Sequence, residues 1–156
     1  MTISVNKRIC KLEVQVNNCT DYNFSKRQIR DVCRKAIDLY RAHNAGKEEF
    51  SISIALVGQN EMRKLNRNFR KKDKVTDVLS FCEEESIPDI IEEGQKKYLG
   101  EIILCPSYID NDTQFFVALA HGTLHLLGAR HGKKMFAIQE EAGSSIIKKV
   151  SKNKDE

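Results

Sequence analysis

The stretch "DTQFFVALAHGTLHLLGARHG", residues 112–132, decides how this chain folds. Its first part, residues 112–127, is apolar on nearly every side when it is wound as a helix. A helix that lacks a polar face is normally buried, because such a helix has no side suited to contact with water. The stretch therefore predicts a helix in the middle of the domain, with the other elements packed around it.

Three of the protein's four histidines, His121, His125 and His131, lie in this stretch. His121 and His125 are four residues apart, so they share one face of a helix. Gly128 stands where a helix commonly ends in a left-handed residue, so the chain can turn back and bring His131 to the same point. The spacing HxxxHxxGxxH predicts that three imidazoles bind one metal ion.

Three neutral imidazoles leave one position of a tetrahedral zinc ion open for water, as in catalytic zinc sites. The ion lowers the pKa of this metal-bound water towards about 7, which makes the water a usable nucleophile. The competing interpretation is a set of core histidines satisfied by backbone hydrogen bonds, or a chance cluster. We favour the metal site because an unpaired buried imidazole is costly.

The same spacing occurs in the metzincin proteases, where a glutamate follows the first histidine and acts as the general base. In this chain that position is Gly122. The spacing therefore indicates a metal site, whereas Gly122 counts against a peptidase.

The remaining periodicities predict four strands and further helices around the central one. Alternating or apolar runs predict strands at residues 10–16, 51–57, 75–81 and 98–105, and apolar stripes predict helices at residues 25–42, 60–69 and 135–150. We therefore predict an α+β (mixed α/β) fold, a four-stranded sheet packed by four to five helices. Residues 1–150 would form one domain and residues 151–156 a short charged tail.

Length and composition restrict the class of protein. The chain has 156 residues, 31% of them charged, and a net charge of +4, which fits one globular domain. Its five cysteines are odd in number and form no CxxC pair, which argues against both a disulfide framework and a cysteine zinc site. No run resembles a signal peptide or a membrane span, so we expect a soluble cytoplasmic protein.

Charge is distributed unevenly along the chain. Residues 63–74, "RKLNRNFRKKDK", carry seven basic residues and one Asp, whereas residues 83–93, "EEESIPDIIEE", carry six acidic residues and no basic one. A basic run is the electrostatic footprint of nucleic-acid binding, but it is also common on a solvated helix face. The acidic run is equally open: it is either a protein contact or a solvated loop.

Three segments together resemble one known family. The stretch "HGTLHLLGARH" is similar to the HGxLHLxGxDH signature of the YbeY family of endoribonucleases. The stretch "LNRNFRKKDKVTDVLSF", residues 65–81, resembles that family's Asn-x-x-[Tyr/Phe]-Arg-x-x-Asp-x-x-Thr-Asp-Val-Leu-Ser-Phe block, and "LGEIILC" resembles its Leu-Gly-Asp-Ile strand. The segments occur in the family's order and spacing, and the resemblance covers roughly residues 50–145 and, more loosely, the whole chain.

The resemblance implies one zinc ion, or another divalent metal, on His121, His125 and His131. It implies cleavage of single-stranded RNA, a role in forming the 3′ end of the small-subunit ribosomal RNA, and a role in ribosome quality control. A functionally important arginine of the family corresponds to Arg70, whose planar charged fork suits a phosphate. The expected RNA contacts are Arg67, Arg70, Lys71, Lys72 and Lys74.

Two residues depart from the family pattern. Arg130 stands where the family has an aspartate before the third histidine, and arginine cannot accept a hydrogen bond from an imidazole. Cys82 stands where the family commonly has proline, and we expect it to be a small buried residue. Thr76 and Asp77 would either orient the site or start a strand, and the second role is favoured.

No side chain is identified as the general base. Glu101, Glu140 and Glu141 are candidates only because they are carboxylates near the motifs. Two other functions stay open: a noncatalytic ribosome-assembly factor with a structural metal, and a metal-dependent hydrolase of peptides or small molecules. The expected partners are ribosomal RNA, the small subunit and a ribosomal protein, with neither a membrane nor a nucleotide cofactor.

Overall fold

A computed structural model describes residues 10–44 and 47–154 of the chain, with side chains up to residue 146. Its elements in chain order are β1 (Lys11–Asn18), α1 (Lys26–Tyr40), η1 (Ala42–Asn44), β2 (Glu49–Leu56), α2 (Gln59–Arg70), β3 (Val78–Cys82), β4 (Lys96–Leu104), η2 (Pro106–Tyr108), α3 (Asp112–Leu126) and α4 (Lys133–Lys154). No helix within the described ranges combines the length and the apolar character that crossing a membrane requires.

The four strands form one mixed sheet in the order β1-β2-β4-β3. β1, β2 and β4 run parallel, and β3 is antiparallel to β4 at one edge. Alternate residues of β2 are buried, because its side chains point in turn to the two faces of the sheet. The four predicted strands and the α+β class are confirmed.

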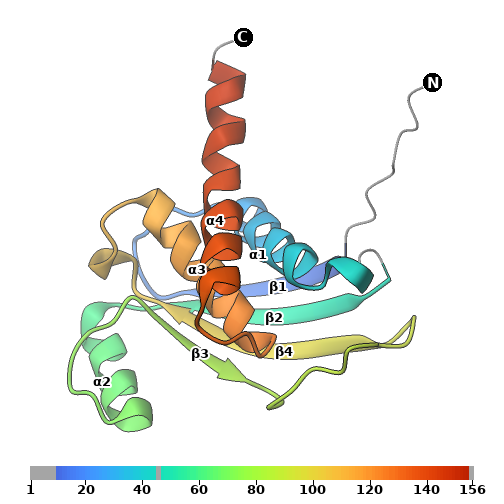
Figure 1. Cartoon of the computed structure of the whole chain (residues 1–156). Coiled ribbons are helices and arrows are strands. Elements are labelled where there is room, and N and C mark those ends of the chain that lie inside the picture. The colour runs from blue at the N-terminus through green and yellow to red at the C-terminus, as the bar shows by residue number, and fades with distance from the viewer. Residues whose placement is uncertain (1–9, 45–46, 155–156) are drawn as a thin grey trace.

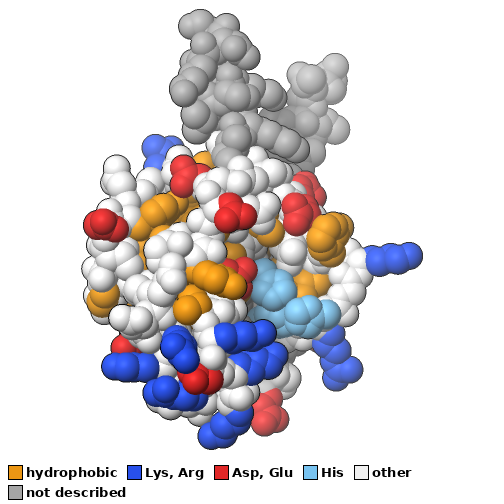
Figure 2. Space-filling model, turned by 90° about the vertical axis from the view of Figure 1, so that its left-hand side faces the viewer, with side chains coloured by type: hydrophobic (Ala, Val, Ile, Leu, Met, Phe, Trp, Pro, Cys, Tyr) orange, Lys and Arg blue, Asp and Glu red, His pale blue; other side chains and the backbone are white. Residues whose placement is uncertain are grey.

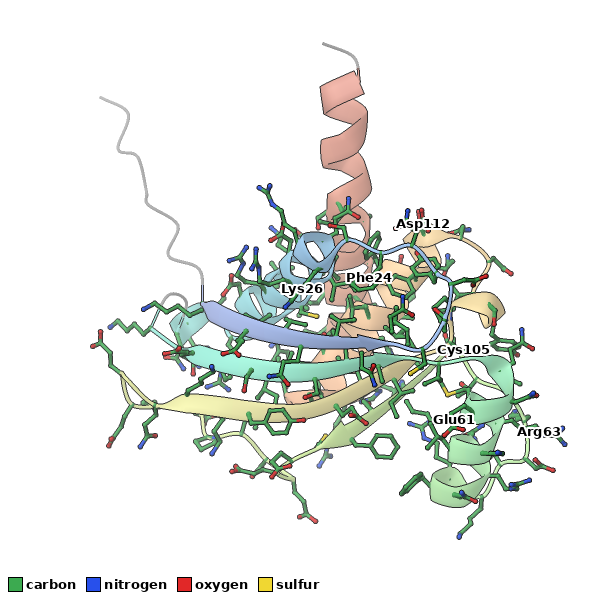
Figure 3. The ribbon with its side chains drawn as sticks, turned by 180° about the vertical axis from the view of Figure 1, so that it is seen from behind. Phe24, Lys26, Glu61, Arg63, Cys105 and Asp112 are labelled. Carbon is green, nitrogen blue, oxygen red and sulfur yellow. The ribbon has the colours of Figure 1, made fainter. Side chains whose placement is uncertain are left out.

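Helices α1, α3 and α4 cover one face of the sheet, whereas α2 lies apart from them, beyond the end of β2 (Figure 1). In the view from behind, α2 carries the labelled Glu61 and Arg63 below the level of the sheet (Figure 3). Helix α3 is central, since it packs against α1, α4, β3 and β4. Ten of its fifteen residues are buried, as the apolar stretch predicts.

Two glycines allow α3 to approach its neighbours closely. A Cβ atom on Gly122 would lie 2.9 Å from Cγ2 of Ile102 in β4, and a Cβ on Gly143 of α4 would lie 2.8 Å from the backbone of Val117 in α3. Both positions are therefore closed to larger side chains. Helix α3 is fixed between the sheet on one side and α4 on the other.

The details differ from the sequence prediction at two places. The third strand begins at Val78 rather than at residue 75, because residues 75–77 lead into the sheet without pairing along it. Helix α4 continues to Lys154, so the backbone of residues 151–154 is helical rather than a separate tail, and residues 155–156 lie outside the described part. All five cysteines are free thiols, as predicted.

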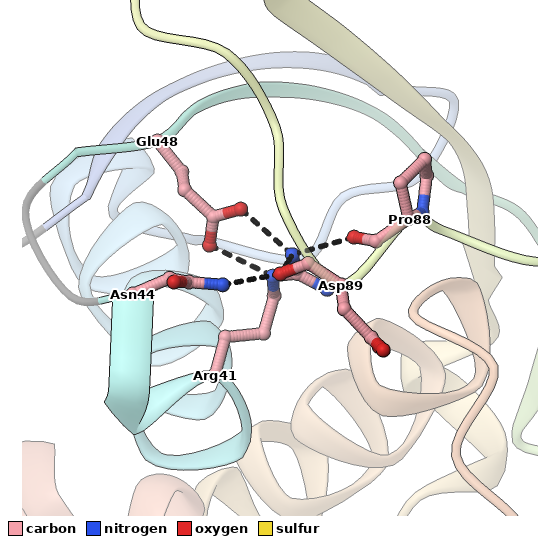
Figure 4. A network of polar contacts seen from close by, with 5 residues as sticks. All are labelled: Arg41, Asn44, Glu48, Pro88 and Asp89. Atoms are coloured by element: carbon pink, nitrogen blue, oxygen red, sulfur yellow. Dashed lines mark hydrogen bonds and ion pairs between the residues drawn. The ribbon is translucent and has the colours of Figure 1, made fainter.

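A buried ion pair fastens the acidic loop to the rest of the domain (Figure 4). Arg41, at the end of α1, donates from Nε and Nη2 to the two carboxylate oxygens of Glu48, each at 2.7 Å. Its Nη2 also donates to the carbonyl oxygens of Pro88 and Asp89 at 2.8 and 3.1 Å, and Asn44 donates to the same Asp89 oxygen. Arg41 and Glu48 are only 5% and 4% exposed.

Candidate metal centre

The three histidines come together at the carboxyl end of α3. Their ligand nitrogens all lie within 4.8 Å of one another, and Nε2 of His121 is 3.0 Å from Nε2 of His125. Metal–nitrogen bonds of zinc are about 2.0–2.1 Å long, so two nitrogens at this separation fit one shared ion. The donor set of three imidazoles therefore suits zinc or another divalent transition metal.

A tight turn returns His131 to the end of the helix. Gly128 has a φ of +86°, the left-handed region that glycine adopts without steric cost. The N–H of Ala129 donates to the carbonyl of Leu124, and the N–H of Gly128 donates to that of His125, both at 3.0 Å. These two bonds form the Schellman motif. The turn predicted at Gly128 is confirmed.

Gln139 of α4 orients the first histidine. Its Oε1 lies 2.8 Å from Nδ1 of His121, and an amide oxygen can only accept a hydrogen bond. Nδ1 therefore carries the imidazole proton, and Nε2 presents its lone pair to the place where the three rings meet. A histidine that binds a metal through one ring nitrogen usually donates a hydrogen bond from the other.

Burial and neighbouring charges keep His125 neutral. Its pKa falls to about 4, chiefly because burial disfavours the charged ring and secondly because His121 and His131 are close. The charge of Arg70 acts in the same direction. A neutral imidazole is the form that binds a metal.

The sequence of this chain is similar to those of known endoribonucleases. A family model described as Endoribonuclease YbeY matches residues 15–148. The chain belongs to this family. A relative in Staphylococcus carnosus, named Endoribonuclease YbeY, is 37% identical over 109 residues, which cover 60% of this chain and 71% of the relative. Its counterpart in Staphylococcus saprophyticus is 36% identical over 110 residues, 61% of this chain and 71% of that relative.

A solved structure is similar in fold. The solution structure of a Thermotoga maritima protein superposes with a TM-score of 0.52 over 90% of this chain and 93% of the other, at 19% sequence identity. This likeness supports the arrangement of the sheet and the helices.

The basic segment that is shared with the YbeY family covers the end of α2 and the loop after it. Lys71 ends this helix with a φ of +61°, and buried Asn66 holds the following loop by donating to the carbonyl of Lys74 at 2.9 Å. Arg67, Arg70, Lys71, Lys72 and Lys74 are all exposed. Arg67 lies 3.8 Å from Asp73, which partly neutralises it. Figure 2 shows lysine and arginine side chains gathered directly below the histidines.

The three candidate bases, Glu101, Glu140 and Glu141, differ in their position relative to the histidines. Glu140 lines a cavity next to His121, whereas exposed Glu141 does not contribute to its wall. Glu101 lies two residues before Ile103, which packs on the α2 side of the sheet, so Glu101 points away from the histidines. As a base, Glu101 is therefore unsuitable.

Two residues of the "TDVLSF" block have structural roles. Oδ1 of Asp77 accepts from the N–H of Val78 at 2.8 Å and from the hydroxyl of Thr76 at 3.3 Å. The carbonyl of Asp77 also accepts from the N–H of Cys105 at 2.9 Å. These bonds fix the start of β3.

The prediction of a buried Cys82 is wrong. Cys82 is exposed at the end of β3, and its thiol donates to the carbonyl of His125 at 3.3 Å. Partial burial nevertheless raises the pKa of this thiol. Cys82 thus contacts the backbone of the site without being one of the clustered ligands.

Arg130, the other residue that departs from the family pattern, is also exposed. The hydrogen-bond acceptor for a ligand histidine comes from Gln139 and not from the position of Arg130.

The sequence analysis missed Gln139. The available signal was its place in α4, between inward-facing Ile138 and Ala142, where a polar side chain needs a partner. The helical pattern does not identify this partner, because His121 is 18 residues away from Gln139 in sequence.

Replacing Gln139 with leucine is expected to weaken metal binding by about 10- to 100-fold, because His121 loses the acceptor that fixes its tautomer. The measurement is competition for zinc with a chromophoric chelator. Gln139→Glu, which keeps an acceptor, should retain affinity close to that of the unchanged protein. Equal zinc affinity in the leucine variant and the unchanged protein would contradict this role.

Proposed function

We propose that this protein is a metal-dependent endoribonuclease that cuts single-stranded RNA. The observation that carries the proposal is the cluster of three imidazoles, with lysine and arginine side chains gathered below it (Figure 2). Family membership supports RNA as the substrate, since the relatives are named as endoribonucleases. We further propose that the RNA is ribosomal, with roles in maturation of the small-subunit 3′ end and in ribosome quality control.

His121, His125 and His131 would hold the metal, for which zinc is our proposal. A bound ion of this type polarises a phosphoryl oxygen and activates water. Gln139 keeps His121 in the tautomer that can act as a ligand. Arg70 would bind the phosphate that is attacked and neutralise the charge that develops on it.

The carboxylate of Glu140 is the best placed of the three candidate bases. It lines the cavity that also contacts His121, whereas neither Glu101 nor Glu141 contributes to that wall. With Gly122 facing the sheet, the position used by metzincin proteases supplies no base here. We therefore propose Glu140 as the general base.

The lysines after α2 would hold the RNA backbone. Lys71, Lys72 and Lys74 are exposed, and contacts of this kind act on phosphates regardless of sequence. Selection of one RNA site would then depend on the partner, for which we propose the small ribosomal subunit, including one of its proteins.

Arg70→Ala tests the proposal directly. Cleavage of a labelled single-stranded ribosomal RNA fragment should fall by about 100- to 1,000-fold, as expected when one donor to the developing charge is lost. Zinc content and thermal unfolding should not change. The matched control is Arg27→Ala, which removes an exposed arginine from α1.

Three results would count against the proposed roles of Arg70 and the metal in RNA cleavage. These are unchanged cleavage in Arg70→Ala, equal loss in the Arg27 control, and cleavage that survives full removal of metal by a chelator. Metal binding and RNA binding without any cleavage would favour the noncatalytic assembly factor.

A further inference from the structure

A cavity of about 470 Å³ opens beside His121, on the surface between α3 and α4. Its walls come from the start of β3, η2, α3 and α4. Helix α2, which the structure describes completely, contributes nothing to them. The volume lies within the range of about 300–1,000 Å³ that is usual for small-ligand sites.

The charge of this cavity is opposite to that of the basic segment. Asp77, Asp110 and Glu140 lie in its wall, and none of the described lining residues is a lysine or an arginine. A phosphate group would be repelled there. The cavity therefore suits an uncharged part of a nucleotide, while the phosphates follow the basic segment near Arg70.

Tyr108 gives the cavity an aromatic wall. The side chain belongs to the short helix η2 and is 52% exposed, although a large aromatic residue gains most when it is covered. Exposed aromatic rings are the platforms on which proteins stack the bases of single-stranded RNA. Gln114 lines the same cavity and offers an amide that can both donate and accept.

We propose that this cavity, named here the Tyr108 cavity, binds one unstacked RNA base next to the phosphate that is cut. The base stacks on Tyr108, and its polar edge faces Gln114 and Glu140. This inference rests on the proposed endoribonuclease function and adds a base-recognition site to it. It accounts for the selection of single strands, because a base held in a duplex cannot enter the cavity.

The carboxylates also imply a preference among bases. Cytosine presents an exocyclic amino group, a donor that a carboxylate can accept, whereas uracil presents a carbonyl oxygen at the same position. Next to Glu140 that carbonyl would face another acceptor. Cytidine is therefore expected at this position in preference to uridine.

Binding of short oligonucleotides tests the cavity independently of cleavage. The probes are fluorescent 2′-O-methyl oligocytidylate and oligouridylate of equal length, kept intact as checked on gels, with zinc-loaded full-length protein. Anisotropy should give at least about fivefold tighter binding of oligocytidylate, the lower limit for one good pair of hydrogen bonds. Tyr108→Ala should weaken binding of oligocytidylate by about 5- to 150-fold, as expected for one lost stack.

Two further variants separate stacking from folding. Tyr108→Phe keeps the ring and should bind nearly as the unchanged protein does. The matched control is Tyr98→Ala, which removes a tyrosine that is 39% exposed and hydrogen-bonded to Ser53 in the sheet, and which should not alter RNA binding. Gln114→Ala should reduce the preference for cytidine without removing the stack.

The outcomes distinguish a failure of the base-binding proposal from a failure of the proposed endoribonuclease function. Equal binding of the two oligonucleotides, or unchanged binding in Tyr108→Ala, overturns the proposal that the Tyr108 cavity binds a base, even when single-stranded RNA is still cut. If the protein neither binds nor cuts RNA, both the endoribonuclease function and the base-binding role of the cavity are overturned. Tighter binding of oligocytidylate that depends on the ring of Tyr108 supports the proposal.

Discussion

His125→Ala is expected to abolish metal binding at the centre and to reduce RNA cleavage by about 1,000-fold or more, since a bound metal contributes several kcal/mol of charge stabilisation. His125 is the middle ligand by geometry: its ring centroid is 4.4 Å from that of His121 and 4.7 Å from that of His131. Without it, two imidazoles remain, too few for a stable zinc site.

Elemental analysis of the purified protein measures the first part of this prediction. About one zinc per chain is expected in the unchanged protein and none in the variant. Thermal unfolding adds a second readout, because a ligand that binds only the folded state raises the melting temperature. Zinc should raise the melting temperature of the unchanged protein but not that of His125→Ala.

The fourth histidine provides the control. His43 is exposed on η1, outside the cluster, so His43→Ala should keep zinc, cleavage and the melting shift. If His125→Ala retained one tightly bound zinc, the three-histidine centre would be wrong. If it lost the metal yet still cut RNA at the original rate, the metal would have a structural role only.

Arg41→Ala is expected to lower the free energy of unfolding by about 3–5 kcal/mol, the usual cost of removing one partner of a buried ion pair. Glu48 would be left buried without its cation, and the carbonyls of Pro88 and Asp89 would lose a donor. Urea denaturation followed by circular dichroism measures the change.

Two variants define the cause of that loss. Arg34→Ala removes an arginine whose pair with Asp31 is about one quarter exposed, and it should cost less than about 1 kcal/mol. The double replacement Arg41→Met with Glu48→Leu should recover much of the stability, because apolar residues of similar size often substitute well for a buried pair. Equal losses in Arg34→Ala and Arg41→Ala would contradict the special role of this buried pair.

Local patterns were sufficient to predict much of the site. His121, His125 and Gly128 lie within about two helical turns, where spacing alone determines which side chains share a face. The buried character of α3 followed from the same short stretch. The strands were also predictable, because burial on alternate positions leaves a regular pattern in the sequence.

Contacts between distant segments were not predictable in this way. The sheet order β1-β2-β4-β3 depends on pairing across the whole chain. Gln139 and Arg41 act through partners that a single sequence does not identify. The exposure of Cys82 was missed for a related reason, since the burial of a strand residue depends on what packs against it.

The packing of Gly122 has a consequence for how reaction types can diverge. The residue after the first histidine is the base in metzincin proteases, but here Cγ2 of Ile102 closes that position. A glutamate introduced at Gly122 would have to push aside the side chains of Ile102 and Val78, whose Cγ2 atoms would lie 2.9 and 3.3 Å from its Cβ. A change of chemistry on this ligand frame therefore involves the neighbouring strands as well as the substituted residue, so the packing of the sheet constrains which reactions the fold can acquire.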